Sequence, residues 1–272
     1  IAFLMLIQSS LSARNSSNKN NSTIYTLNCD KTNISNPVLS SCNIENQHIA
    51  FDSWQIEKNR KVTKLTLKNI QNENLPLNLA DSFPNLEEFS TSETSFRSIK
   101  RENLRYLRKL EILRLQRGEL LRIRRDSFDD LENLRVIDLS GNYLNIIQPE
   151  LFRDMEKLEE LNVSDNGIEE LNPRTFRYLM NLKTFSADGN KISMISSDTF
   201  AYNRRLSKIS ISGNVLRFID AMAFSGLREL YSINLSKNDC IDKEYSISKM
   251  KSGFMAFLIK DVQATCQLKG KI

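Results

Sequence analysis

Few residues in this sequence could carry out catalytic chemistry. The 272 residues contain one histidine, His48, so neither a multi-histidine metal site nor histidine-based catalysis is expected. The carboxylate pairs Glu87-Glu88 and Glu159-Glu160 are adjacent, and on a strand their side chains point to different parts of the surface. The sequence has no G-x-S-x-G, no H-E-x-x-H and no phosphate loop. We therefore expect no enzymatic activity and no cofactor or metal.

Basic side chains offer a different chemistry, the binding of anions. The overall net charge of +5 is mild, but eleven Lys or Arg and three acidic residues lie between Arg97 and Arg125. A candidate basic patch consists of Arg117, Arg122, Arg124 and Arg125. It could attract an anionic glycan, an acidic partner or a lipid surface, or it could be an ordinary solvated flank. Nucleic acid is not expected, because the sequence has the features of a secreted protein described below and the arginine cluster at 122–125 has no interleaved aromatic residues.

The N-terminal region and the glycosylation motifs indicate the secretory route. Residues 1–13 begin with an apolar run followed by small residues and resemble part of a signal peptide, with a short buried strand as the alternative. Residues 14–23 are rich in Asn and Ser and are expected to be disordered. No later apolar run has transmembrane length. Six Asn residues begin N-x-S/T motifs, namely Asn15, Asn20, Asn21, Asn33, Asn162 and Asn234.

A repeat of 24 residues organises the rest of the chain. Equivalent segments begin at Val62, Leu86, Leu110, Leu134, Leu158, Leu182, Leu206 and Leu230. The shared pattern is L-x-x-L-x-L-x-x-N-x-L, best seen in the segment that begins at Leu134 and weaker in the first three segments. A phenylalanine recurs at the same interval from Phe128 to Phe224. Such regularity predicts a solenoid in which each unit buries its apolar face against its neighbours.

The spacing within a unit predicts where each part lies. The alternating L-x-L segment predicts a short strand that pairs in parallel with the next unit. Asn142 and its equivalents follow the strand, where a buried amide can bond to backbone groups freed by the turn. The first three units carry Ile70, Thr94 and Gly118 at this position, so their backbone must be satisfied in another way. The phenylalanine column is expected to fill the wide convex side.

These motifs resemble extracellular leucine-rich repeat proteins of the 24-residue type. The resemblance covers about residues 62–238 and implies a curved α/β-type solenoid of eight repeats with disulfide-bonded end caps. The parallel strands are expected on the concave face, with short helical or extended segments on the convex face. The chain also looks similar to insect secreted proteins of this type, including mosquito immune proteins, and to Toll-like or Slit-like ectodomains.

The four cysteines flank the repeats and are interpreted as cap residues. An N-terminal cap over residues 24–61 contains Cys29 and Cys42, and a C-terminal cap over residues 239–272 contains Cys240 and Cys266. In a long solenoid the two pairs must form within each cap, because the other connectivities would join opposite ends. A zinc site is the alternative, but no C-x-x-C motif and no supporting histidine are present. The resemblance implies four cysteines in each cap, so these caps are reduced.

Further elements are expected within the caps. Strands are expected at residues 24–27 and 48–51 of the N-terminal cap. A helix over residues 250–259 is expected to place Phe254, Phe257 and Leu258 on the last repeat. The C-terminal cap has no proline before Cys240, which is another departure from the family pattern.

The repeat register also predicts which polar residues line the concave face. Glu111, Arg135, Glu159 and Lys183 occupy one column and should form a ladder of alternating charge. The candidate binding face consists of Glu111, Arg114, Arg135, Asp138, Glu159, Asn162 and Lys183. The alternative is that these charges only keep the surface of the sheet solvated and the strands in register, without binding a ligand. Tyr231 is the one aromatic residue expected in these columns, and glycans on Asn162 and Asn234 would cover the C-terminal half of the face.

Together these features predict a secreted, non-enzymatic module that binds a protein or a glycan, in extracellular recognition or innate immunity. The alternatives are an ectodomain fragment of an adhesion or signalling receptor and a structural matrix protein. An extracellular protein partner is expected, an anionic glycan is possible, and neither nucleic acid nor a membrane span within this chain is expected.

Overall fold

The computed structural model describes residues 25–27, 41–45, 54–56, 58–247 and 253–267. The predicted signal peptide and leader lie outside these residues. So do Cys29, His48 and the motifs at Asn15, Asn20, Asn21 and Asn33.

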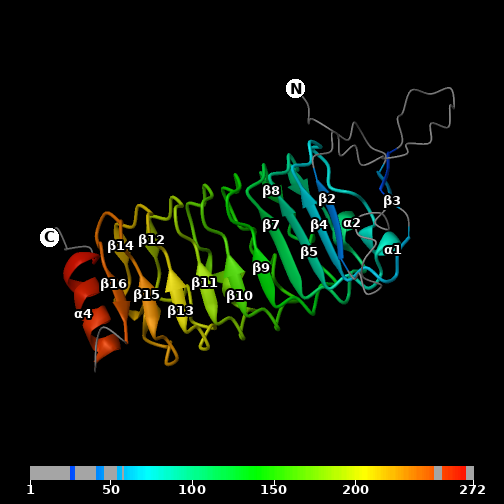
Figure 1. Ribbon diagram of the computed structural model, residues 1–272. Helices are drawn as coiled ribbons and strands as arrows, with labels where there is room; N and C mark the ends of the chain where they lie inside the picture. The colour runs from blue at the N-terminus through cyan, green and yellow to red at the C-terminus, as the bar shows by residue number, and fades with distance from the viewer. Residues whose placement is uncertain (1–24, 28–40, 46–53, 57, 248–252, 268–272) are drawn as a thin grey trace, which may run out of the picture.

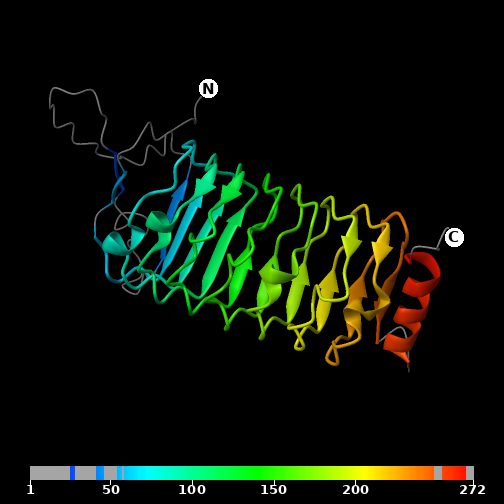
Figure 2. The same cartoon turned by 180° about the vertical axis from the view of Figure 1, so that it is seen from behind.

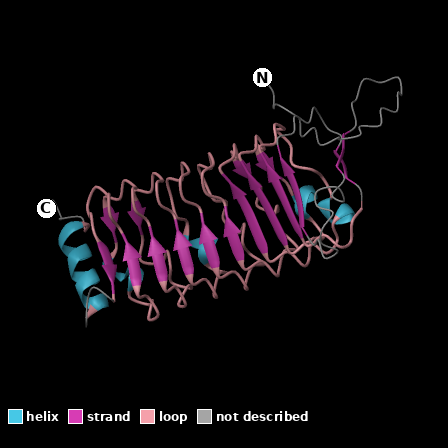
Figure 3. Cartoon of the chain, viewed as in Figure 1, coloured by secondary structure: helices cyan, strands magenta, loops and turns pink. Residues whose placement is uncertain are grey.

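A 10-stranded sheet runs along one face of an elongated solenoid (Figures 1 and 3). In spatial order its strands are β2 (Ser41–Glu45), β4 (Lys64–Lys68), β5 (Glu88–Ser92), β7 (Ile112–Gln116), β9 (Val136–Asp138), β10 (Glu160–Asn162), β11 (Thr184–Ser186), β13 (Lys208–Ser210), β15 (Ser232–Asn234) and β16 (Glu244–Ser246). Neighbouring strands are parallel except β15 and β16, which are antiparallel. Leu113 lies opposite Ile137, and Leu161 lies opposite Phe185. The register therefore confirms the 24-residue repeat.

The opposite face is built from short strands and single helical turns (Figure 2). Two small parallel sheets pair β6 (Ser98–Ile99) with β8 (Arg122–Ile123) and β12 (Met194–Ile195) with β14 (Phe218–Ile219). The helical turns are α1 (Leu79–Ser82), α2 (Arg101–Leu104), α3 (Pro173–Phe176) and the 3₁₀ turn η2 (Ala221–Phe224). At the start of α3, Asn172 Oδ1 accepts a hydrogen bond from the Arg174 N–H at 3.0 Å, and Pro173 suits the first helical position.

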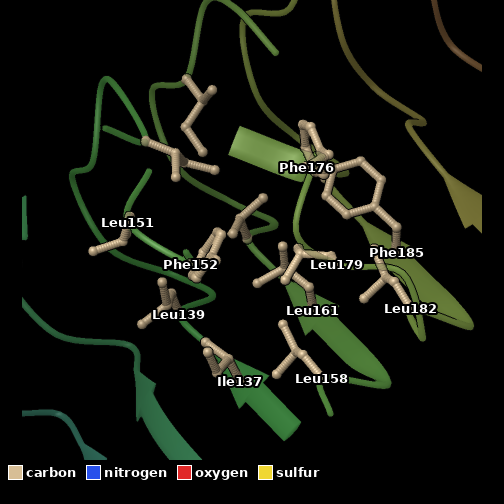
Figure 4. Close-up of a cluster of buried hydrophobic side chains, with 14 of the residues drawn as sticks. Ile137, Leu139, Leu151, Phe152, Leu158, Leu161, Phe176, Leu179, Leu182 and Phe185 are labelled. Atoms are coloured by element: carbon tan, nitrogen blue, oxygen red, sulfur yellow. The ribbon is translucent and has the colours of Figure 1, made fainter. Parts of the chain in front are cut away.

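One continuous hydrophobic core lies between the two faces (Figure 4). Leu158, Leu161 and Leu182 reach it from the sheet side, and Phe152 and Phe176 reach it from the convex side. The phenylalanine column is confirmed, since ring centroids lie 6.3 Å apart for Phe128 and Phe152 and 5.6 Å apart for Phe176 and Phe200. Each unit buries its apolar residues against its neighbours, as the spacing predicts.

The asparagine position forms a ladder of hydrogen bonds between units. Asn190 is buried, and its Nδ2 donates to the carbonyl of Val163 in the preceding unit at 3.0 Å. Its Oδ1 accepts from the Ile168 N–H at 3.0 Å. Equivalent bonds are made by Asn142, Asn166, Asn214 and Asn238. The amides therefore satisfy the turn backbone as predicted.

The first three units replace this ladder with backbone contacts. The Ser95 N–H donates to the Ile70 carbonyl at 3.0 Å, and the Glu119 N–H donates to the Thr94 carbonyl at 3.1 Å. The strands of these units, β4, β5 and β7, have five residues, whereas β9 has three. A Cβ atom on Gly118 would lie 3.0 Å from the Thr94 carbonyl oxygen, so the close approach of the backbones favours glycine there.

The described part of the N-terminal cap consists of paired strands. β1 (Tyr25–Leu27) pairs in parallel with β3 (Trp54–Ile56), and β2 pairs in parallel with β4 and so extends the main sheet. Cys42 is buried and disulfide-bonded. The predicted pairing with Cys29 and the strand expected at 48–51 lie outside the described residues.

The C-terminal cap covers the last repeat with α4 (Phe254–Thr265). Phe254, Leu258 and Val262 are buried at a spacing of four residues, and Cys240 and Cys266 form a disulfide. The expectation that Phe257 also packs on the repeat is wrong, because its side chain is 48% exposed beside Tyr245. The buried row of Phe254, Leu258 and Val262 is centred on Leu258, and position 257 lies about 100° from it around the helix, at the flank of the buried face.

Candidate functional site

The concave face is lined by alternate residues of each strand. In β7, Leu113 and Leu115 are buried, whereas Ile112, Arg114 and Gln116 are partly exposed. This alternation follows from the two-residue period of a strand. The columns predicted from the repeat therefore do line the open surface of the sheet.

A first charged network joins the strands β4, β5 and β7. Glu88 accepts a hydrogen bond from Arg114 Nη1 at 2.6 Å and lies 3.2 Å from Lys64 Nζ. Arg114 therefore turns toward the N-terminal end of the sheet instead of joining Asp138. The carboxylate between two cations holds three neighbouring strands in a fixed arrangement of side chains.

A second charged network joins Arg135, Glu159 and Lys183. Glu159 lies 3.0 Å from Arg135 Nη2 and 2.8 Å from Lys183 Nζ. The hydrogen bonds from Lys183 and then Arg135 hold the pKa of Glu159 below its usual value. This part of the predicted ladder is formed. Glu111 makes no ion pair with any described residue, so the ladder does not extend to it.

Asp138 lies between the two networks and binds only its neighbours. Its Oδ2 accepts from Gln116 Nε2 at 2.7 Å, and its Oδ1 accepts from the Ser140 N–H at 3.0 Å. The predicted cluster of Arg114, Asp138 and Arg135 therefore does not converge on a single point.

Two apolar side chains occupy the centre of this region and were missed by the sequence analysis. Ile112 and Val136 are partly exposed and lie opposite each other in β7 and β9. They belong to a column that is polar or charged in the other repeats, with Lys64 and Glu88 before them and Glu160 and Thr184 after them. Reading this third column would have found them. We call Ile112, Val136 and the two charged networks the central concave patch.

The C-terminal half of the concave face is lined by small polar residues. Asn162 Oδ1 accepts from the Ser164 N–H and Asn234 Oδ1 accepts from the Ser236 N–H, each at 3.0 Å. Both asparagines are partly exposed at the ends of their strands. They remain candidate glycosylation sites, and glycans there would cover this half of the face.

The predicted basic patch divides into two places. Arg122, Arg124 and Arg125 line a convex cavity of about 350 Å³, together with Leu121 and Ile146 among others. Arg124 Nε lies 3.5 Å from Asp126, which offsets part of the positive charge. Arg117 lies elsewhere, directly after β7, where it has a positive φ of 48° and its N–H donates to the Ser140 carbonyl. The cavity can accept an anionic group, but Arg117 does not contribute to it.

Within the described residues, no three or more His, Cys, Asp or Glu side chains converge in a way that could hold a metal ion. No helix there has both the length and the apolar character that a membrane crossing requires.

The parallel sheet, the asparagine ladder and the phenylalanine column define a leucine-rich repeat solenoid. The family model for the leucine rich repeat matches residues 108–168, 147–192, 157–216 and 181–239. The chain is a leucine-rich repeat protein that resembles Toll-like ectodomains. A comparison with curated proteins finds no match.

Solved structures support the resemblance. A chain in the glycosylated Drosophila Toll–Spatzle complex has 25% sequence identity and a TM-score of 0.66, and the match covers 73% of this chain and 27% of that chain. A chain in another Toll–Spatzle structure has 26% identity and a TM-score of 0.57, and the match covers 65% of this chain and 24% of that chain. A chain in the TLR13–ssRNA13 complex shares the fold, at 23% identity and a TM-score of 0.61, with 65% and 25% covered. This chain thus spans about a quarter of the length of these solved relatives.

Proposed function

We propose that this chain is a secreted, non-enzymatic recognition module that binds a protein partner through the central concave patch, in extracellular recognition or innate immunity. The observation that carries the proposal is the pair Ile112 and Val136, partly exposed between two charged networks. Protein interfaces commonly have an apolar centre and a polar rim.

The charged networks favour a protein as the ligand. Because Glu88 and Glu159 already hold their cations, binding loses less side-chain entropy than it would with free side chains. The candidate glycosylation site Asn234 lies on β15, away from the patch, whereas Asn162 lies on β10, the strand beside that of Val136, so a glycan there would border the patch. At its two apolar positions the patch has no charge to desolvate.

The extracellular part of the proposal has separate support. The disulfide between Cys240 and Cys266 is typical of oxidising compartments. One solved relative is a chain of the Toll–Spatzle complex, a molecular hub in Drosophila development and innate immunity. These relatives motivate an immune role and a protein partner for this chain.

A receptor ectodomain is the second candidate, because the chain matches only about a quarter of each Toll chain. Expression of the complete transcript with its native ends separates the two candidates. Soluble protein in the medium supports the secreted module, and retention at the cell surface supports the ectodomain. A protein that stays inside the cell in reduced, unglycosylated form contradicts both.

The binding site is tested with a photo-crosslinking residue at position 112. In extracellular fluid we expect a crosslinked protein that disappears when Val136→Asp is added. Ile146→Asp is the matched control, since Ile146 is an exposed apolar residue on the convex face. A crosslink that survives Val136→Asp, or that Ile146→Asp abolishes equally, would rule out the central concave patch.

A further inference from the structure

An uncompensated group of positive charges lies on one edge of the C-terminal repeats. We call it the C-terminal basic edge, formed by residues 177–184, 201–208 and 225–232, which lead into the strands β11, β13 and β15. It is the lower edge of the solenoid at the C-terminal end in Figure 1. These segments contain six basic residues, namely Arg177, Lys183, Arg204, Arg205, Lys208 and Arg228. They contain a single acidic residue, Glu229.

Five of these basic side chains keep their charge free for a ligand. Lys183 is paired with Glu159, but the other five are exposed and form no ion pair with any described residue. The basic stretch seen in the sequence near residue 100 is partly neutralised, because Arg97 pairs with Glu73, Arg101 with Asp130 and Arg114 with Glu88. A count of charges along the sequence misses these pairs, since they join residues in different repeats.

The repeat register arranges the edge as rows parallel to the solenoid axis. Met180, Arg204 and Arg228 occupy one row at 24-residue intervals, and Tyr178 and Tyr202 occupy another. Backbone bonds fix neighbouring turns, with the Ser207 N–H on the Lys183 carbonyl and the Tyr231 N–H on the Ser207 carbonyl, each at 2.9 Å. Successive units of such a stack lie about 5 Å apart. The charges therefore follow a line.

Aromatic and apolar side chains are interleaved with the charges. Tyr202 is 57% exposed, Met180 is 50% exposed and Tyr231 is 49% exposed. The faces of such tyrosines can contact the apolar faces of sugar rings, while their hydroxyl groups stay available for hydrogen bonds.

Two of the arginines are already held in place. Arg205 Nη1 donates to Asn181 Oδ1 at 2.6 Å, and the Arg177 guanidinium lies 5.1 Å from the centre of the Tyr178 ring. Contacts of this kind reduce the entropy that is lost when a ligand binds.

We propose that the C-terminal basic edge binds a linear sulfated polysaccharide. Guanidinium groups suit tetrahedral oxyanions, because two N–H groups can donate to two oxygens of one anion. A line of charges matches an extended polyanion better than a single small anion, which needs a converging cluster. A protein partner is less well matched, because the exposed apolar residues are spaced among charges and form no central apolar cluster.

The edge has a defined limit. In the two preceding repeats the equivalent positions carry Asp129, Asp130, Asp154 and Glu156. Asp129 is bonded to Arg153 at 2.6 Å, so the positive charge there is neutralised. Acidic side chains therefore interrupt the positive charge on the N-terminal side of the C-terminal basic edge. The proposal does not depend on the central concave patch.

The test measures binding of the full chain to fluorescent heparin in 150 mM NaCl. We expect the triple variant Arg177→Glu, Arg204→Glu and Arg228→Glu to bind at least about tenfold more weakly, the loss of one charge-assisted contact or more. The matched control is Lys58→Glu, Arg60→Glu and Lys61→Glu, which changes the net charge equally at the other end of the solenoid and should bind like the parent chain. If the triple variant unfolds, Arg204→Gln with Arg228→Gln provides the same comparison with a smaller change.

Several results would overturn the proposal. The parent chain could fail to bind heparin, the triple variant could keep the parent's affinity, or the matched control could lose as much affinity as the triple variant. If heparin binding is lost instead in a triple variant with Arg122→Glu, Arg124→Glu and Arg125→Glu, the site lies in the convex cavity. Equal binding of fully desulfated heparin would exclude sulfate recognition. Equal binding of polyuridylate or polyglutamate through the same three arginines would assign the edge to a nucleic acid or to an acidic protein.

Discussion

At the scale of single residues, one buried amide serves each turn of the solenoid. Asn190 donates to the Val163, Ala187 and Asp188 carbonyls and accepts from the Ile168 N–H, so four backbone polar groups depend on one side chain. Leucine would fill the space but would leave buried backbone groups without partners, and each of these costs about 1–3 kcal/mol. The position is thus set by hydrogen bonding and not by volume.

We expect Asn190→Ala to lower the free energy of unfolding by about 3 kcal/mol, because it removes these bonds and leaves the backbone groups buried. Urea unfolding followed by circular dichroism measures the change. Lys191→Ala is the control and should change stability by less than about 0.5 kcal/mol, because Lys191 is exposed. Equal effects of the two substitutions would show that the amide is not what holds the turn.

Glu159 gives the concave face a dependence on pH. Its pKa is lowered in the folded chain from a usual value of 4.5, so the folded state binds fewer protons than the unfolded state. The stabilisation that Glu159 gives through its bonds with Lys183 and Arg135 is therefore complete above that usual value. It is lost as the pH falls through the lower folded pKa.

We expect Glu159→Gln to destabilise the chain by about 0.5–1 kcal/mol at pH 7, the range of a small surface network, and by progressively less as the pH falls below about 4. Thermal melting across this pH range measures the difference. Glu160→Gln is the comparison, since Glu160 is exposed and forms no ion pair with any described residue. A difference that persists unchanged at low pH would mean that packing, and not charge, links the three strands.

At the scale of elements, the C-terminal cap shields the apolar end of the stack. The buried row of α4 lies against the last turn, and Asp261 on the same helix accepts bonds from Lys243 at 2.7 Å and from the Tyr245 hydroxyl at 2.9 Å. The bond from Lys243 is the main reason that the pKa of Asp261 is lowered, and burial is the main reason that the pKa of Tyr245 is raised. The helix is therefore fixed by apolar contacts on one side and charge at its flank.

We expect Leu258→Ala to cost about 2–4 kcal/mol, because Leu258 is fully buried, and Phe257→Ala to cost less than about 1 kcal/mol. Differential scanning calorimetry of the two variants measures the contrast. A larger loss in Phe257→Ala would restore the arrangement expected from the sequence, in which Phe257 packs on the last repeat.

The elements also show how far sequence reasoning extends. The leucine and asparagine spacing predicts the strands, their register and the turn bonds, because these depend on the backbone, which repeats every 24 residues. The partners of long charged side chains could not be predicted in this way. Arg114 reaches Glu88 and Arg101 reaches Asp130 diagonally, across 26 and 29 residues, instead of bonding within a column. Ile112 and Val136 were not predicted either, because the sequence reasoning considered only the polar and charged columns.

At the scale of the whole molecule, a solenoid is stabilised only by contacts between neighbouring units. Phe176 illustrates this, since its ring lies 5.1 Å from Phe185 and 5.6 Å from Phe200, both in the following repeat. Among the described residues, no ring contact joins distant repeats, so damage at one repeat is expected to spread only through its neighbours.

We expect Phe176→Ala to cost about 3–5 kcal/mol and to act locally, because it leaves a cavity beside β10 and β11. Amide hydrogen exchange should accelerate most in β10, β11 and β13, while β4 and β5 keep most of their protection. Phe224→Ala is the matched control at the C-terminal end, where exchange should accelerate in β15 and α4 instead. Uniform acceleration through every strand in both variants would mean that the array unfolds as one cooperative unit. The central concave patch and the C-terminal basic edge would then be lost together, whereas local unfolding would disturb the repeats around β10, β11 and β13 and leave the network of Lys64, Glu88 and Arg114 in place.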